Sequence, residues 1–350
     1  MTMFTGITTL LPVFIRKMER TTVPDLIRAA DSVLSQDCGI ERELLIIDDG
    51  SEPALDSIHE LRALLATPAV RVLRLVNNQG LEFALNAGLT QARYDLIARM
   101  DGDDLWRPGK LKKQLELLSS DPELTLVATS MRLVHPHNPD LDSDDLRGGG
   151  WEEVLSFFKR VGCPFPHGSI LARKSVFHVL GGYPQVPLLT YFGDFALWGS
   201  WVRFFKVSVL HEVLYEYTVS ERQVSTLFAE RLRRASGMVH QTFLDLGDHQ
   251  RIPGAVAQIA QRLNLPLLKT SAVLCTAWRF YNDILVDPDL YEAARIVFPD
   301  RGVHRYEEAV DLLDDRFFYL SCGVFDKRPS SHARCVHTVG SLDSLTSGMG

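Results

Sequence analysis

Three carboxylates stand within four positions at Asp101, Asp103 and Asp104, in a segment, 99–104, that directly follows a mainly apolar run, 95–98. Ionised carboxylates this close repel one another, and their burial is costly unless something compensates the charge. One or two carboxylates with substrate phosphates are the usual ligands of Mg²⁺ or Mn²⁺. Open α/β sheets bind ligands where strands end. The motif therefore predicts a divalent cation with a phosphorylated ligand at the end of a strand.

A solvated acidic turn with a helix cap is the simpler explanation of the same motif. It suits Asp104, because Pro108 follows at the expected start of a helix. It suits Asp101 and Asp103 less well, since positions i and i+2 of an extended segment face the same side. Both of these side chains can therefore meet one ligand.

Two other polar turns follow predicted elements. Asp48, Asp49 and Gly50 end an apolar run, and the pattern fits either a self-capped turn or a ligand contact. Gly80 precedes a predicted helix, where it either caps the helix or allows close approach to a phosphate or ribose.

Three further residues can serve a reaction. Asp194 stands before a bulky apolar segment, 195–201, and partial desolvation would raise its pKa toward that of a general base, although a helix N-cap is the alternative. His167 follows Pro-Phe-Pro and is as readily structural as functional, so it is not assigned as the base. Arg222 is either a loop residue closing over a diphosphate or a solvent-facing side chain.

Composition limits the class of protein. The chain has 350 residues, 46% hydrophobic and 23% charged, which is ordinary for globular domains. A net charge of −7 argues against nucleic acid as a partner. Five scattered cysteines without a CxxC pair favour a reducing compartment. No signal peptide and no apolar run of about 18 residues are recognised, so we expect a cytoplasmic protein, with peripheral contact to the inner face of the membrane left open.

Apolar strands alternate with amphipathic helices up to about residue 135, which predicts βαβ units and a largely parallel sheet. The expected strands cover 7–13, 43–47, 70–76, 95–100 and 124–131, and the expected helices start near 22, 56, 81 and 108. A loop is expected over 135–150 and mixed structure over 151–226. We expect an α/β domain at 1–226, a helical region at 227–326 and a loose tail at 327–350.

The order of these motifs resembles the family 2 glycosyltransferases of the GT-A fold over about residues 5–226. The segments that carry the resemblance are Leu11-Pro12-Val13-Phe14, Ile46-Ile47-Asp48-Asp49-Gly50-Ser51, Asn78-Gln79-Gly80, Arg99-Met100-Asp101-Gly102-Asp103-Asp104, His167-Gly168-Ser169 and Gly193-Asp194-Phe195-Ala196-Leu197-Trp198. The last differs from the family's Glu-Asp-x-x-Leu-Trp, because Gly193 stands in place of the glutamate.

The resemblance implies a Rossmann-like GT-A fold, with a mixed, mostly parallel sheet flanked by helices and a helical C-terminal extension. It implies metal-dependent, inverting transfer of a sugar from a nucleoside diphosphate sugar, UDP-linked, to a glycan, lipid-linked or protein acceptor. By the same resemblance, Asp194 is the base, Asp103 ligates Mn²⁺ or Mg²⁺, and Asp101 contacts ribose or the metal shell. The other implied donor-site residues are Pro12, Phe14, Asp49, Gly80, His167 and Arg222.

Two other classes stay open. A non-catalytic nucleotide-sugar or glycan-binding module could use the same fold, and the departure at Gly193 favours it. A sugar-phosphate nucleotidylyltransferase would be expected to carry a glycine-rich basic loop after its first strand. The segment 14–17 has the charge but not the glycines. The sequence predicts no oligomeric state.

Overall fold

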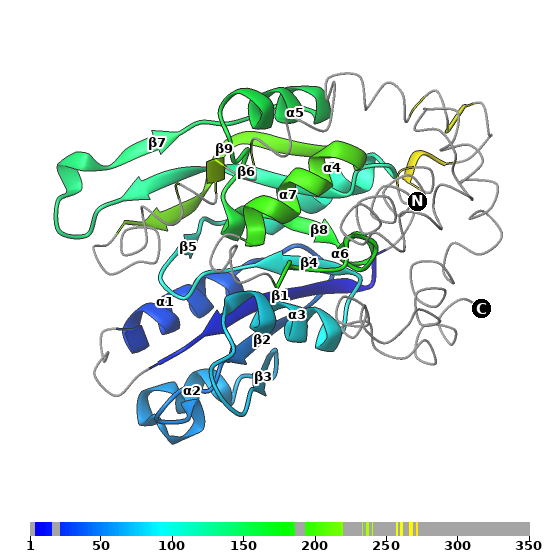
Figure 1. Cartoon of the computed structure of the whole chain (residues 1–350). Coiled ribbons are helices and arrows are strands. Elements are labelled where there is room, and N and C mark those ends of the chain that lie inside the picture. Colours follow the sequence, from blue (N-terminus) through cyan, green and yellow to red (C-terminus); the bar gives the residue numbers. More distant parts are fainter. Residues whose placement is uncertain are drawn as a thin grey trace, which may run out of the picture.

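The computed structural model of the chain describes residues 4–15, 22–185 and 193–219, with a few further positions between 233 and 271. Figure 1 shows strands and helices alternating through the first half of this part. The strands are β1 Gly6–Val13, β2 Glu41–Asp48, β3 Val70–Arg74, β4 Leu96–Arg99, β5 Leu105–Trp106, β6 Leu126–Val134, β7 Ser143–Asp145, β8 Leu171–Arg173 and β9 Val207–Thr218. The helices are α1 Thr22–Leu34, α2 Arg62–Leu65, α3 Leu81–Gln91, α4 Lys110–Ser120, α5 Trp151–Arg160, α6 Lys174–Leu180 and α7 Gly193–Phe204.

The described strands form one mixed sheet in the order β3-β2-β1-β4-β8-β6-β9-β5, with β7 beside β6. Strands β3, β2, β1 and β4 are mutually parallel, and so are β6 and β9. Strand β8 runs antiparallel between β4 and β6. The carboxyl ends of β1, β2 and β4 therefore meet at one edge of the sheet.

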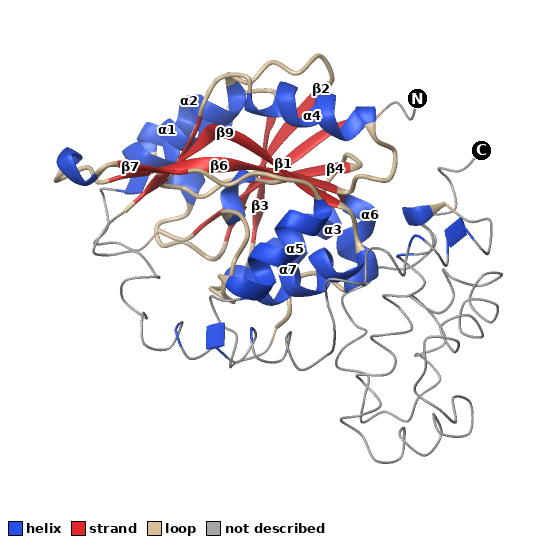
Figure 2. Ribbon diagram, turned by 90° about the horizontal axis from the view of Figure 1, so that it is seen from above, coloured by secondary structure: helices blue, strands red, loops and turns tan. Residues whose placement is uncertain are grey.

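Helices cover both faces of the sheet, as Figure 2 shows, with α1, α2 and α4 on one face and α3, α5, α6 and α7 on the other. Side chains alternate between two cores accordingly: Ile7 and Leu11 of β1 face the α1 side, and Leu10 faces the α3 side. A strand buried on both faces needs apolar residues at nearly every position. The strands expected before residue 135 could therefore be recognised as apolar runs in the sequence.

The mixed α/β fold is confirmed, and the strands expected before residue 135 are present with ends shifted by a few residues. Two expectations are corrected. The helix expected over 56–65 is two short 3₁₀ turns followed by the single turn α2, and the loop expected over 135–150 contains β7, which pairs with β6. The regions expected at 227–326 and 327–350 lie almost wholly outside the described residues. Within the described part, no helix is both long and apolar enough to span a membrane.

Candidate active site

Strand register brings three segments singled out in the sequence to one edge of the sheet. Val13 is the register partner of Asp48, and Leu10 is the partner of Arg99. The amide of Asp49 donates to the carbonyl of Val13 at 2.9 Å. Half-buried Pro12 and Phe14, the acidic turn after β2 and the acidic turn after β4 are thus neighbours.

The two carboxylates after β2 do different work. Asp48 is fully buried, accepts a 2.8 Å hydrogen bond from the Ser51 amide and pairs with Arg74. Its role is to fix the turn. Asp49 is also buried, and its two carboxylate oxygens accept from the amides of Gln79 and Gly80 at 2.8 and 2.9 Å. Asp49 therefore fastens the loop before α3 to the end of β2.

Glycine is required in this turn. Gly50 has φ +74°, and a Cβ there would lie 2.5 Å from the carbonyl carbon of Asn77. The turn and the loop before α3 are packed backbone against backbone. Gly80, with φ +94°, has open space where a side chain would project, which leaves its surface accessible to a ligand.

Asp49→Asn is expected to lower the free energy of unfolding by about 1–3 kcal/mol, because the asparagine amide nitrogen would face a backbone N–H donor. Urea denaturation measures the change. Asp37→Asn is the control, since the exposed Asp37 carboxylate also accepts a backbone amide, from Gly39. Equal stability of the two variants would contradict the anchoring role of Asp49.

The three carboxylates after β4 have three environments. Asp104 is buried and accepts from the Tyr215 hydroxyl and, at 2.6 Å, from the Thr218 amide. Burial, together with the charge of Asp103, raises the pKa of Asp104 to about 7. Asp104 therefore joins β9 to the site. The helix-cap interpretation of Asp104 is wrong, because Gly109 is the residue that precedes α4.

Asp101 and Asp103 remain as candidate ligands. Asp101 pairs with Arg99, and its side chain is 30% exposed. The carboxylate of Asp103 accepts a hydrogen bond from its own backbone amide, and among the described residues no other side chain pairs with it. Burial raises the pKa of Asp103, and Arg99 opposes that rise. A partly buried, acceptor-only group without a cationic partner of its own suits a metal ion.

The donor set fits a particular kind of metal site. The described residues contain no group of three or more His, Cys, Asp or Glu side chains arranged around a cation. They do provide Asp103 with Asp101 two positions away. A Mg²⁺-like ion held by one or two carboxylates takes its other ligands from phosphates and water. The arrangement fits a cation that binds together with a diphosphate.

Arg99 was missed by the sequence reasoning. It ends β4, is only 2% exposed, and pairs with Asp101. Its Nε is buried without a hydrogen-bond partner among the described residues. Its charge lowers the pKa of both Asp103 and Asp194, so one cation acts on the acidic turn and on the carboxylate at the start of α7. An arginine in an otherwise apolar strand beside an acidic turn was the available signal.

Asp194 and His167 are brought together. Asp194 Oδ1 accepts from the Phe195 amide at 2.8 Å at the start of α7, and Oδ2 lies 3.5 Å from His167 Nδ1. The other ring nitrogen of His167 is 2.8 Å from the Tyr183 hydroxyl. Burial raises the pKa of Asp194 and lowers that of His167, and the positive charge of Arg99 lowers the pKa of both. Asp194, 27% exposed, is thus a carboxylate of raised basicity beside a neutral imidazole.

The sequence-predicted residues therefore fall into two groups. Pro12, Phe14, Asp49, Gly80, Asp101 and Asp103 lie along the carboxyl ends of β1, β2 and β4. His167 and Asp194 contact each other beside α7. Arg222 lies outside the described residues.

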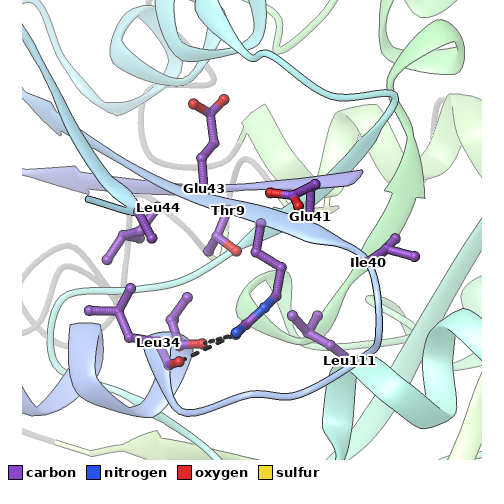
Figure 3. A pocket seen from close by; sticks show the side chains of 10 residues that line it. Thr9, Leu34, Ile40, Glu41, Glu43, Leu44 and Leu111 are labelled. Carbon is purple, nitrogen blue, oxygen red and sulfur yellow. Dashed lines mark hydrogen bonds between the residues drawn. The ribbon is translucent and has the colours of Figure 1, made fainter. Parts of the chain in front are cut away.

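A cavity elsewhere in the molecule does not coincide with this site. Figure 3 shows it between the end of α1 and the first residues of β2, lined by Thr9, Leu34, Glu43 and Leu111 among others. There Arg42 donates to the carbonyls of Val33 and Leu34 at 3.5 and 3.3 Å, which caps the C-terminus of α1. This cavity lies at the amino ends of the strands, opposite the acidic turns. Its one arginine, Arg42, already binds the carbonyls at the end of α1.

Comparisons with known proteins agree with this architecture. Residues 12–180 match the family model described as Glycosyl transferase family 2. The putative glycosyltransferase EpsE of Bacillus subtilis is 30% identical over 211 residues, which are 59% of this chain and 71% of that protein. The amylovoran biosynthesis glycosyltransferase AmsE of Erwinia amylovora is 29% identical over 45% of this chain and 56% of its own.

A solved structure supports the fold. The mannosyltransferase PcManGT from Pyrobaculum calidifontis, in complex with GDP-Man and Mn²⁺, superposes with a TM-score of 0.50. The alignment has 18% sequence identity and covers 92% of this chain and 88% of that one. At this identity the likeness concerns the fold, and it confirms the GT-A-type α/β arrangement expected from the sequence.

Proposed function

Because this chain belongs to glycosyl transferase family 2, we propose that it transfers a sugar from a nucleoside diphosphate sugar to an acceptor hydroxyl, with UDP as the nucleotide and with inversion at the anomeric carbon. The observation that carries the proposal is the placement of Asp103, whose carboxylate forms no ion pair or hydrogen bond with a described side chain, at the strand edge where Asp49 and Phe14 also lie. The name of the relative AmsE, an amylovoran biosynthesis glycosyltransferase, supports synthesis of a polysaccharide as the setting.

On the donor side, Asp49 is the acceptor for an imide N–H of the base, with Pro12 and Phe14 against the ring. The open surface of Gly80 admits the ribose or a phosphate. Asp103, with Asp101 beside it, would hold a divalent cation, whose positive charge would stabilise the departing diphosphate. Arg99 holds Asp101 in place from the end of β4.

On the acceptor side, Asp194 takes the proton of the acceptor hydroxyl as the new glycosidic bond forms. The start of α7 fixes its Oδ1 through the Phe195 amide, and Oδ2 is the oxygen that faces His167. His167, neutral and held by Tyr183, orients this carboxylate without competing for the proton. One base and one leaving group suffice for a single displacement with inversion, so no covalent nucleophile is needed.

The test is the thermal stability of the purified protein against a panel of nucleoside diphosphates, with and without Mn²⁺. A ligand at 100 times its dissociation constant adds about 2.7 kcal/mol to stability. We expect UDP to stabilise the protein only with metal, and we expect matching UDP-sugars then to be turned over. Stabilisation by GDP alone would overturn the choice of UDP. Binding without turnover of any UDP-sugar would favour the non-catalytic module.

The pH dependence of kcat/KM is expected to show an acid limb above the ordinary aspartate range, which is centred at about pH 4. Asp194 acts only when ionised, so activity is lost as pH falls through its pKa, and burial raises that pKa. Initial rates from acid to neutral pH at saturating metal measure the limb. A rate that stays constant down to the ordinary aspartate range would contradict Asp194 as the base.

A further inference from the structure

Glu82, in the first turn of α3, reaches across to the start of α7. Its side chain is 7% exposed, and its Oε1 accepts from the amide of Gly193 at 3.4 Å. A carboxylate in the first turn of a helix usually interacts with that helix's own amides. Here it contacts the residue before Asp194, 111 positions later in the chain.

Glu82 occupies the space that a side chain at position 193 would need. A Cβ on Gly193 would lie 2.7 Å from Glu82 Cγ and 3.3 Å from Oε1. It would also lie 3.4 Å from the carbonyl oxygen of Pro184. The backbone at Gly193 is not in the left-handed region. The glycine is therefore dictated by the packing of Glu82 and not by φ.

The position of Glu82 connects the two halves of the site. It lies two residues after Gly80, whose amide Asp49 holds at 2.9 Å. The carboxylate of Glu82 accepts from the amide of Gly193, the first residue of α7 and the neighbour of Asp194. Two hydrogen bonds, joined by the backbone of the first turn of α3, thus link the turn after β2 to Gly193, the residue before Asp194.

We propose that Glu82 is a positioning residue for sugar transfer, which holds the start of α7 so that Asp194 faces the acceptor hydroxyl. Gly193 has no side chain, and the carboxylate that contacts the start of α7 is that of Glu82 in α3. This inference rests on the proposed function. It also offers an explanation for Gly193 other than lost activity, because the side chain of Glu82 fills the space beside that glycine.

Several charged or titratable groups face Asp194 and bear on the test. They are Glu82 from α3, Arg99 from the end of β4, His167 from the 167–169 turn, and Cys163 and Tyr183 from the adjoining loops. The negative charge of Glu82 raises the pKa of Asp194. Its removal should therefore move the acid limb of kcat/KM to lower pH, a change that a purely structural role would not produce.

The first variant is Glu82→Gln. We expect kcat to fall about 10- to 100-fold, the usual cost of a misplaced reacting group, with UDP affinity unchanged and the acid limb moved to lower pH. Glu152→Gln is the matched control, because Glu152 is likewise the second residue of a helix, α5, but is exposed. It should behave as wild type. Wild-type kcat and an unmoved acid limb in Glu82→Gln would overturn the proposal.

Relocating the carboxylate gives the sharper test. Glu82→Ala and Gly193→Glu should each lose activity, and the double variant Glu82→Ala/Gly193→Glu should regain most of it. Glu82→Ala/Gly193→Gln restores the volume without the charge and should not recover. Equal recovery by both double variants would mean that only space matters, which overturns the proposal. If wild type transfers no sugar from any donor, the proposed function itself fails. If wild type transfers sugar and Glu82→Gln does so equally, Glu82 alone is misassigned.

Discussion

Replacing Asp194 with asparagine is expected to lower kcat for sugar transfer by at least about 100-fold, the usual contribution of a general base. The asparagine amide cannot take up the acceptor proton. Its oxygen can still accept from the Phe195 amide, which Asp194 binds at 2.8 Å, so α7 should begin where it does now. The measurement is the single-turnover rate of transfer, with UDP affinity determined in parallel by thermal shift.

UDP affinity should be unchanged in this variant, because the candidate donor residues lie on the ends of β1, β2 and β4 and not on α7. Asp121→Asn is a matched control: its carboxylate is 31% exposed, against 27% for Asp194, and it also pairs with a basic side chain, Lys206. Asp121 precedes β6, away from the acidic turns, and its substitution should leave transfer unaffected. Loss of UDP binding in Asp194→Asn would indicate that Asp194 shapes the donor site instead.

The strands that carry the site could be predicted because their local pattern is strong. Strands β1, β2 and β4 are largely buried, so each contains an apolar run, and β2 and β4 lead into acidic turns. Strands β7 and β8 have three residues each, too few to show a period. Their places are set by pairing with β6 and β4, which no local pattern contains.

The same distinction applies to the site. The acidic turns were visible because their carboxylates directly follow strands. The partners of those carboxylates were not: the Tyr215 hydroxyl that binds Asp104 and the Glu82 side chain that holds Gly193 each come from 111 positions away. In the sequence, Glu82 reads as an ordinary acidic residue in the first turn of a helix. Only the packing of α3 against α7 gives it a second role.

Arg99 also changes how the acidic turn is understood. The strand pattern alone places Asp101 and Asp103 on one face of an extended segment, and only the family resemblance assigns them different roles. The structure pairs Asp101 with Arg99 and leaves Asp103 without a side-chain partner among the described residues. A cation that binds with a diphosphate would therefore gain more from Asp103, because its carboxylate does not have to leave another partner first.

Asp103→Asn is accordingly expected to lower metal-dependent turnover by about 10³-fold. A metal ion supplies several kcal/mol of charge stabilisation to the leaving diphosphate, and each 1.4 kcal/mol is a factor of about ten in rate. The UDP-induced thermal shift should also lose its dependence on Mn²⁺, which is a measurement independent of turnover. The amide has nearly the same shape as the carboxylate, so folding should be preserved.

Asp104→Asn provides the contrast that separates ligation from structure. Asp104 accepts from Tyr215 and Thr218 and is buried, so its replacement should lower the free energy of unfolding by about 1–3 kcal/mol. Asp103→Asn should instead unfold at the wild-type urea midpoint when metal and nucleotide are absent. If Asp103→Asn keeps Mn²⁺-dependent binding and Asp101→Asn loses it, the ligand is Asp101, and Arg99 must release that carboxylate when the metal binds. Because both carboxylates stand on the same short turn, only this comparison distinguishes the ligand from its neighbour.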